Sequence, residues 1–174
     1  MTKFSLKDKI ALISGSSRGI GFEIAKVFAL NEATVILTSR TRENLEEAKK
    51  QIEWLGGIVD YKVTHFGKMN EIKECIDFVL EKYKKIDILV NNLGLNPVHE
   101  PLIDYSLDVW NKMLNHNLTN YLYTTQCAAK SMKKNNYGKI INISSHSSKH
   151  PFKNFGAYAI VKSGIDMMTR VFAL

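Results

Sequence analysis

Tyr158 and Lys162 stand four residues apart in the stretch 144–162, which reads SSHSSKHPFKNFGAYAIVK. If the segment after Gly156 is helical, four residues turn the chain by about 400° and advance it by about 6 Å, so both side chains project from one face. An ammonium beside a phenol favours the phenolate and lowers the tyrosine pKa from its usual value of about 10. Tyr158 is therefore predicted to exchange a proton near neutral pH, with Ser145 hydrogen-bonding the same substrate oxygen.

The pair alone is weak support for this chemistry. The chain is rich in lysine and has seven tyrosines, so one such spacing is expected by chance. An ordinary exposed pair at this spacing contributes only a few tenths of a kcal/mol to helix stability. The acid–base interpretation therefore requires other elements that bring a cofactor to Tyr158.

A candidate phosphate-binding loop is GSSRGIG at 15–21, between the apolar run KIALIS and the helical pattern FEIAKVFAL. A glycine loop between a strand and a helix N-terminus suits a dinucleotide pyrophosphate. Gly15 would make the tight turn, Gly19 would let the backbone approach the phosphates, and Gly21 would allow close helix–strand packing. The spacing differs from the common G-x-G-x-x-G, and a plain strand–helix turn remains the alternative.

The end of the second predicted strand, TVILT at 34–38, indicates which cofactor is used. An NAD site places an acidic residue there to bind the ribose hydroxyls, whereas this chain has Ser39 and Arg40. Arg40 and Arg18 can clamp a 2′-phosphate by charge-assisted hydrogen bonds. We therefore predict that NADP(H) is preferred over NAD(H); the alternative is that Arg40 simply begins a surface helix.

Strands and helices alternate along the chain. Right-handed crossovers then predict an α/β Rossmann-type, doubly wound parallel sheet in a three-layer αβα domain spanning residues 1–174, with strand order 3-2-1-4-5. The glycine loop, 91–94 and 144–145 then lie together at the carboxyl ends of strands, where ligands bind. Strands are expected at 9–14, 34–38, 58–64, 86–90 and 139–143, and helices at 22–30, 43–55, 69–83, 107–132 and 156–174.

Asn117 falls inside the long helix expected at 107–132. A polar amide in a helix interior lowers helix stability relative to alanine. Two interpretations are open: Asn117 is exposed to solvent, or it forms a polar kink that faces the site.

The bulk composition excludes several classes of protein. The chain is 45% hydrophobic and 24% charged, and no apolar run reaches the length of a membrane span or a signal-peptide core. Its net charge of +7 comes mostly from scattered lysines without a nucleic-acid motif, so a solvated surface is favoured over a nucleic-acid partner. Cys75 and Cys127 make no disulfide framework, which indicates a cytoplasmic protein. His146 and His150 are too few to make a zinc site, so no metal is expected.

Together the motifs SGSSRGIG, NNLG at 91–94, Asn117, Ser145 and YAIVK resemble the signature of the short-chain dehydrogenase/reductase superfamily. The resemblance implies that Tyr158 is the general acid/base and that Lys162 lowers its pKa and holds the nicotinamide ribose. It also implies that Ser145 orients the carbonyl and that Asn117 supports a proton-relay water. The implied cofactor-binding residues are Gly15, Ser17, Arg18, Gly19, Ile20, Gly21, Ser39, Arg40, His65, Phe66, Asn92, Gly94, Tyr158 and Lys162.

Within the superfamily, HFGK at 65–68 and LNP at 95–97 are similar to NADPH-dependent retinal and carbonyl reductases of the peroxisomal-type retinol dehydrogenase/reductase group. The chain departs from the family pattern in three ways. His65 replaces an adenine-binding aspartate, and Leu93 replaces an alanine. The family's strands 6 and 7 and its substrate-covering part are missing, which would leave strand 5 as an exposed edge.

The function implied by the resemblance is NADPH-dependent, reversible reduction of a ketone or aldehyde, with hydride from the nicotinamide and a proton from Tyr158. The partners implied are a small carbonyl or alcohol substrate and, for a full-length form, a homodimer or homotetramer. Two alternatives remain open: a 3-oxoacyl-thioester reductase, and an inactive cofactor-binding fragment or pseudoenzyme.

Overall fold

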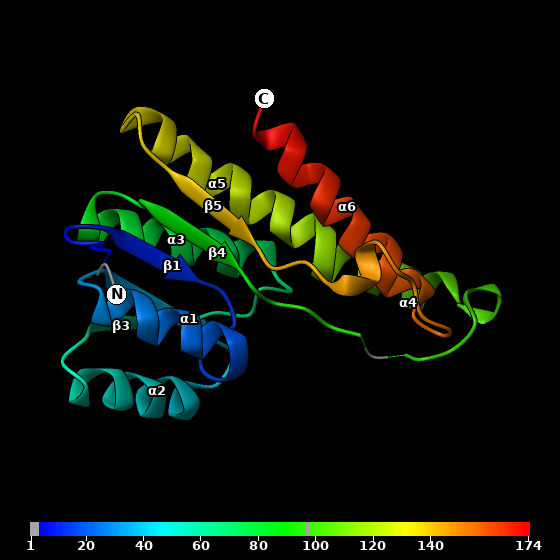
Figure 1. Ribbon diagram of the computed structural model, residues 1–174, viewed down its shortest axis with the longest axis horizontal. Coiled ribbons are helices and arrows are strands. Elements are labelled where there is room, and N and C mark those ends of the chain that lie inside the picture. The colour runs from blue at the N-terminus through cyan, green and yellow to red at the C-terminus, as the bar shows by residue number, and fades with distance from the viewer. Residues whose placement is uncertain (1–3, 97) are drawn as a thin grey trace.

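The computed structural model describes residues 4–96 and 98–174, so Pro97 of the LNP motif lies outside it. Its centre is a five-stranded parallel sheet in the order β3-β2-β1-β4-β5, which confirms the predicted topology (Figure 1). β1 lies in the middle, with Leu12 opposite both Ile36 and Leu89. The strands are β1 (Ile10–Ile13), β2 (Thr34–Ser39), β3 (Ile58–Val63), β4 (Ile88–Asn91) and β5 (Lys139–Asn142).

Helices cover both faces of the sheet, which makes the predicted three layers. α1 and α2 pack on one face through a cluster that includes Ala25 and Ile52, and α3 and α5 pack on the other through Cys75 and Ala128. Because both faces are covered, every residue of β1 and β4 is buried. The helices are α1 (Gly19–Leu30), α2 (Arg42–Trp54), α3 (Met69–Tyr83), α4 (Leu107–Leu114), α5 (Asn120–Lys134) and α6 (Gly156–Phe172), with short turns η1 (Leu102–Asp104) and η3 (His146–Ser148).

The segment 107–132 is helical throughout, as predicted, but it is not one uninterrupted α-helix. A π-helical turn, η2 (Asn115–Thr119), separates α4 from α5. Within it the Asn117 side chain is fully buried and its Nδ2 donates to the Met113 carbonyl at 3.1 Å. Of the two interpretations of Asn117, solvent exposure is therefore wrong. π-helical turns of this kind are frequent at functional sites.

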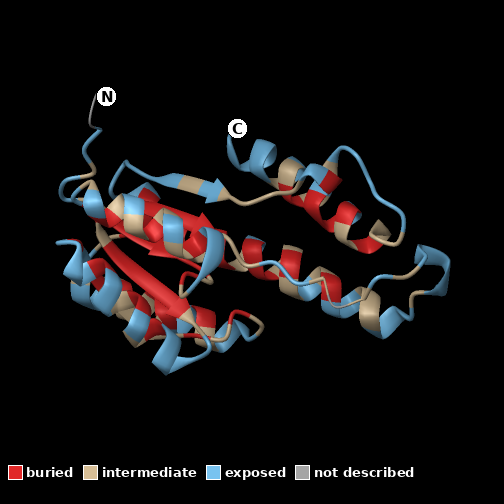
Figure 2. Cartoon of the chain, turned by 60° about the horizontal axis from the view of Figure 1, so that its bottom comes forward, coloured by how far each residue is buried: buried red, intermediate tan, exposed pale blue. Residues whose placement is uncertain are grey.

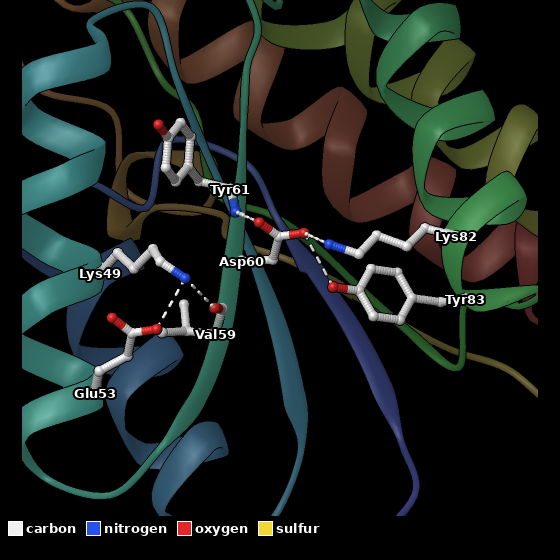
Figure 3. A network of polar contacts seen from close by, with 7 residues as sticks. All are labelled: Lys49, Glu53, Val59, Asp60, Tyr61, Lys82 and Tyr83. Carbon is white, nitrogen blue, oxygen red and sulfur yellow. Dashed lines mark hydrogen bonds and ion pairs between the residues drawn. The ribbon is translucent and has the colours of Figure 1, made fainter.

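At the outer edge of β3, which pairs with no further strand, side chains form hydrogen bonds with backbone groups (Figure 3). Thr64 N–H bonds the Ser39 carbonyl on β2, so in a parallel ladder the alternate residues Val59 and Tyr61 turn their backbone groups outward. Lys49 Nζ donates to the Val59 carbonyl at 3.0 Å, and the Tyr61 N–H donates to the carboxylate of Asp60 at 2.8 Å. The same carboxylate accepts from Lys82 and Tyr83. Burial raises the pKa of Asp60, but its hydrogen bonds to Lys82, Tyr61 and Tyr83 together hold that pKa below the usual value. Charged side chains thus close this edge against further strands.

At the opposite edge of the sheet, no strand pairs with the outer side of β5 in the described residues. β5 pairs with β4 alone, and half of its residues are exposed whereas β4 is buried throughout (Figure 2). Residues 4–96 and 98–174 contain no sixth or seventh strand. Within these same ranges, no helix is both long and apolar enough to cross a lipid bilayer.

Candidate active site

The loop between β1 and α1 needs glycine at two positions for different reasons. Gly15 has a φ of +63°, and a Cβ there would lie 2.7 Å from the Leu93 side chain. Gly21 lies so close to the strand exit that a Cβ would come within 2.5 Å of the Gly15 carbonyl oxygen. The predicted turn at Gly15 and close packing at Gly21 are confirmed.

The exit of β4 holds this loop in place. Asn92 Nδ2 donates to the carbonyls of Ser14 and Gly15, both at 3.1 Å. The backbone N–H groups of Asn92 and Leu93 donate to Ser14 Oγ at 2.9 and 3.3 Å. Asn92, predicted to bind cofactor, therefore uses its side-chain amide to position the glycine loop.

A cavity of about 200 Å³ opens over the carboxyl ends of β1, β2, β3 and β4. Eight predicted cofactor residues line it: Gly15, Ser17, Arg18, Ser39, Arg40, His65, Phe66 and Gly94. Six others do not line it: Gly19, Ile20, Gly21, Asn92, Tyr158 and Lys162. Five lining residues were not predicted: Thr64, Gly67, Leu93, Leu95 and His116. Of these, His116 carries no sequence signal beyond its position beside Asn117.

The cavity suits an anionic dinucleotide. The first-turn N–H groups of a helix lack partners within the helix, and in α1 no side chain caps them and no acidic residue lies among them. A Cβ at Gly19 would meet nothing within 4 Å, so the backbone is open to close approach there. Arg18 and Arg40 line the same cavity and add positive charge.

Lys162 is the largest fully buried side chain in the described residues, at 2% exposed. Its Nζ donates to the Ile143 carbonyl, just beyond β5, at 2.7 Å. Burial lowers the pKa of Lys162 to about 8, against a smaller raising effect of the Asp166 carboxylate. The ammonium is therefore mostly charged at neutral pH, which lies only about one unit below this pKa.

Lys162 Nζ lies beside two tyrosines, 5.5 Å from the ring centre of Tyr121 and 5.7 Å from that of Tyr158. The Tyr121 hydroxyl donates to the Leu93 carbonyl at 2.6 Å. Burial, with a smaller effect of Tyr158, raises the pKa of Tyr121 well above its usual value. Tyr158 is half-buried on the same face of α6 as Lys162, and within the described residues its hydroxyl makes no hydrogen bond. Of these two tyrosines, as the described residues show them, only Tyr158 can offer its hydroxyl to a ligand without breaking an existing hydrogen bond.

Gly94 lies close both to Asn117 of the π turn and to Lys162. A Cβ on Gly94 would lie 3.7 Å from Lys162 Nζ and 3.9 Å from Asn117 Oδ1, so the three residues meet at one point. Asn117 Oδ1 accepts from the Leu95 N–H at 2.7 Å, and its Nδ2 donates to the Leu95 carbonyl at 2.9 Å. The amide thereby fixes the backbone that follows β4. Replacing it would remove both of these hydrogen bonds to Leu95, at a cost of about 0.5–1.5 kcal/mol for each bond.

Ser145 lies beyond the end of β5, where it caps η3. Its Oγ accepts from the Ser147 N–H at 3.2 Å, and η3 packs against α6. Ser163 Oγ on α6 donates to the Ser148 carbonyl at 2.7 Å, which ties the two elements together. The serine and the tyrosine of the predicted set therefore lie on directly packed elements.

The Phe155 ring packs against Tyr158 and belongs to a group of aromatic and histidine rings. The Phe155 ring lies 6.4 Å from that of Tyr158, edge to face, and 4.6 Å from that of His99. His146 and His150, predicted to be polar loop residues, stack at 4.7 Å. Nowhere in residues 4–96 and 98–174 do three or more His, Cys, Asp or Glu side chains form a group able to hold a metal.

Comparison with known proteins agrees with this geometry. The family model described as short chain dehydrogenase matches residues 9–174. Dehydrogenase/reductase SDR family member 4 from Sus scrofa is 31% identical over 169 residues, 97% of this chain and 61% of that protein. The 3-oxoacyl-acyl-carrier-protein reductase FabG of Thermotoga maritima is 34% identical over 168 residues, 97% of this chain and 68% of that protein.

Solved structures give the same fold. A metagenomic short-chain oxidoreductase in complex with NADP superposes with a TM-score of 0.92 at 30% identity, over 97% of this chain and 76% of that one. A 7α-hydroxysteroid dehydrogenase complexed with NADH and a 7-oxo bile acid superposes with a TM-score of 0.93 at 29% identity, over 98% and 66%. The chain spans about three fifths of the length of several curated relatives that it matches.

Proposed function

Because the chain belongs to the short-chain dehydrogenase family, we propose that it is an oxidoreductase that reversibly reduces a ketone or aldehyde to an alcohol with NADP(H). One observation carries the proposal. A buried lysine ammonium lies between two tyrosines, and of these only Tyr158 has a hydroxyl free for a substrate.

In the proposed reaction the bound dinucleotide supplies the hydride that the carbonyl carbon receives. Tyr158 O–H donates its proton to the carbonyl oxygen, which becomes the alcohol hydroxyl, and the Lys162 ammonium stabilises the phenolate that remains. Ser145 Oγ donates a hydrogen bond to the same oxygen and orients it. In the reverse direction the phenolate accepts the alcohol proton. Asn117 acts by fixing the backbone on which Gly94 borders Lys162.

The proposed cofactor residues form three groups, which would bind different parts of the dinucleotide. Ser17, just before α1, and Gly19 and Ile20, in its first turn, would hold the pyrophosphate. Arg18 and Arg40 would hold the 2′-phosphate, and His65 and Phe66 would border the adenine. That one similar structure was solved with NADP supports this arrangement.

The cofactor preference rests on Arg40. We expect the parent chain to bind NADPH about tenfold or more tightly than NADH, and Arg40→Asp to abolish that difference, because a charge-assisted hydrogen bond becomes a like-charge repulsion. The check is titration of the fluorescence of each reduced cofactor. Arg42→Asp is the matched control, since Arg42 bonds Tyr61 at 3.2 Å and does not line the cavity. Equal affinity of the parent for both cofactors would refute the preference.

The similarity to FabG keeps a 3-oxoacyl-thioester reductase as the second candidate. Following NADPH oxidation with simple ketones and aldehydes, and separately with a 3-oxoacyl thioester, distinguishes the two. We expect oxidation with the simple carbonyls; oxidation with the thioester alone would establish the alternative. Binding of NADPH without oxidation on any carbonyl would mean that the chain is an inactive cofactor-binding fragment.

We also propose self-association and a cytoplasmic location. Exposed apolar side chains on η1, α4 and α6 support a homodimer or homotetramer, since burying them in a partner copy is favourable. They are Leu102, Ile103, Leu107, Met167, Val171 and Phe172.

Two free cysteines, Cys75 and Cys127, are compatible with a reducing compartment.

A further inference from the structure

The loop after β3 is held rigidly at the wall of the cofactor cavity. The His65 N–H donates to the carboxylate of Glu71 at 2.7 Å, and the Lys68 N–H donates to the His65 carbonyl at 2.9 Å. Lys68 and Glu71 also form an ion pair at 2.9 Å. The backbone of His65 is thus fixed on both sides before any ligand binds.

The imidazole of His65 is fixed as well. The Gly67 N–H donates to His65 Nδ1 at 2.9 Å, and the His116 ring packs edge to face at 6.2 Å. A nitrogen that accepts a hydrogen bond carries no proton, so the proton of this ring is on Nε2. Nε2–H makes no hydrogen bond within the described residues and is not among their buried unpaired atoms. His65 therefore presents one free donor and no free acceptor to the cavity that it lines.

This donor lies on the side of the cavity that the proposed function assigns to the adenosine half. The pyrophosphate site is at the start of α1, and Lys162 and Tyr158 lie beyond β4, next to the end of β5. The second nucleoside must then extend the other way, across β2 towards β3. His65 follows the end of β3 and lines the cavity on that side, so in this arrangement its Nε2–H would be the donor available to the base.

We propose that His65 binds the purine of the cofactor by donating a hydrogen bond from Nε2–H to an acceptor on the edge of the base. The pocket therefore does not require a 6-amino group on the purine. This proposal rests on the proposed function. A ring nitrogen of adenine can accept the bond, and so can the 6-oxo group of hypoxanthine. An aspartate at this position would offer only acceptors and would select the amino group.

The test compares binding of NADPH with binding of its 6-oxopurine (deamino) analogue, each titrated by its nicotinamide fluorescence. We expect the parent to bind the two within about threefold of each other. His65→Asp should shift the affinity ratio towards NADPH by about tenfold, the usual effect of a hydrogen bond to a charged group. The ratio is informative because the added negative charge weakens both anionic ligands alike.

His65→Phe provides the second variant: it keeps a flat ring and removes both the Nε2–H donor and the acceptor of the Gly67 N–H. We expect it to weaken both dinucleotides by about threefold to tenfold and to leave their ratio near that of the parent. Tenfold preference of the parent for NADPH, or unchanged binding of both by His65→Phe, would overturn the proposal while leaving the proposed function intact. Failure of the parent to bind either dinucleotide would overturn the proposed function and this inference with it.

Discussion

The Tyr158→Phe variant is expected to lose about 10²- to 10⁴-fold in kcat while binding NADPH as tightly as the parent, because it removes only the proton donor. The ring, its edge-to-face contact with Phe155 and the cation at Lys162 all remain. Turnover with a reactive ketone and titration of NADPH fluorescence measure the two quantities separately.

The matched control is Tyr121→Phe, which removes the hydroxyl of a ring whose centre lies nearly as far from Lys162 Nζ as that of Tyr158. Its hydroxyl is already bonded to the Leu93 carbonyl, so we expect a loss of about 1 kcal/mol in stability and nearly unchanged kcat. If Tyr158→Phe kept its activity, or if both variants lost it equally, the assignment of the proton donor would be wrong.

The strand order was predictable because its causes are local in the sequence. β1 and β4 are short apolar runs buried on both faces, and the alternation of such runs with helical patterns allows few right-handed arrangements. The family prediction is confirmed by the match over residues 9–174. Which motifs meet at the carboxyl edge of the sheet follows from topology alone.

The sequence left open whether Asn117 is exposed or forms a polar kink, and it could not decide because the partners that bury the amide include a distant segment. The apolar periodicity of 107–132 is compatible with one continuous helix, and nothing nearby marks Asn117 as buried. Its partners are the backbone groups of Leu95, 22 residues earlier, and Met113. A sequence pattern shows that an amide is present but not which distant backbone it binds. Tyr121 was missed for the same reason, since its acceptor, Leu93, is 28 residues away.

The environment of Lys162 is another feature that the sequence could not predict. Its spacing from Tyr158 predicted a neighbouring ammonium, and that geometry is confirmed. The spacing did not predict that this ammonium is nearly inaccessible to water and bonded to the Ile143 carbonyl. The depressed pKa of Lys162 depends on this burial and therefore only became visible in three dimensions.

Burial of this cation has a measurable effect on stability. The pKa of Lys162 falls from its usual 10.5 to about 8 in the folded chain. Between these values the unfolded chain binds more protons than the folded one, so stability rises with pH across this window. Below pH 8 the full penalty is present, on the order of 3 kcal/mol at 1.36 kcal/mol per pKa unit, and above about pH 10.5 it is gone.

We therefore expect Lys162→Met to be more stable than the parent at pH 7, by about 2 kcal/mol once the lost hydrogen bond to the Ile143 carbonyl is subtracted. The difference should shrink as the pH rises from 8 towards 10.5. Urea unfolding of both proteins at pH 7 and near pH 10 measures it. The same variant should lose turnover, because no ammonium remains to stabilise the phenolate of Tyr158.

The exposed Lys153 supplies the control. Lys153→Met removes the same charge without removing a buried one, so its effect on stability should be within about 0.5 kcal/mol and nearly independent of pH. A Lys162→Met chain that was less stable than the parent at pH 7, or whose difference from it did not change with pH, would contradict the buried, titrating ammonium. The expected outcome, higher stability with lost turnover, is what a residue kept for chemistry rather than for folding should give.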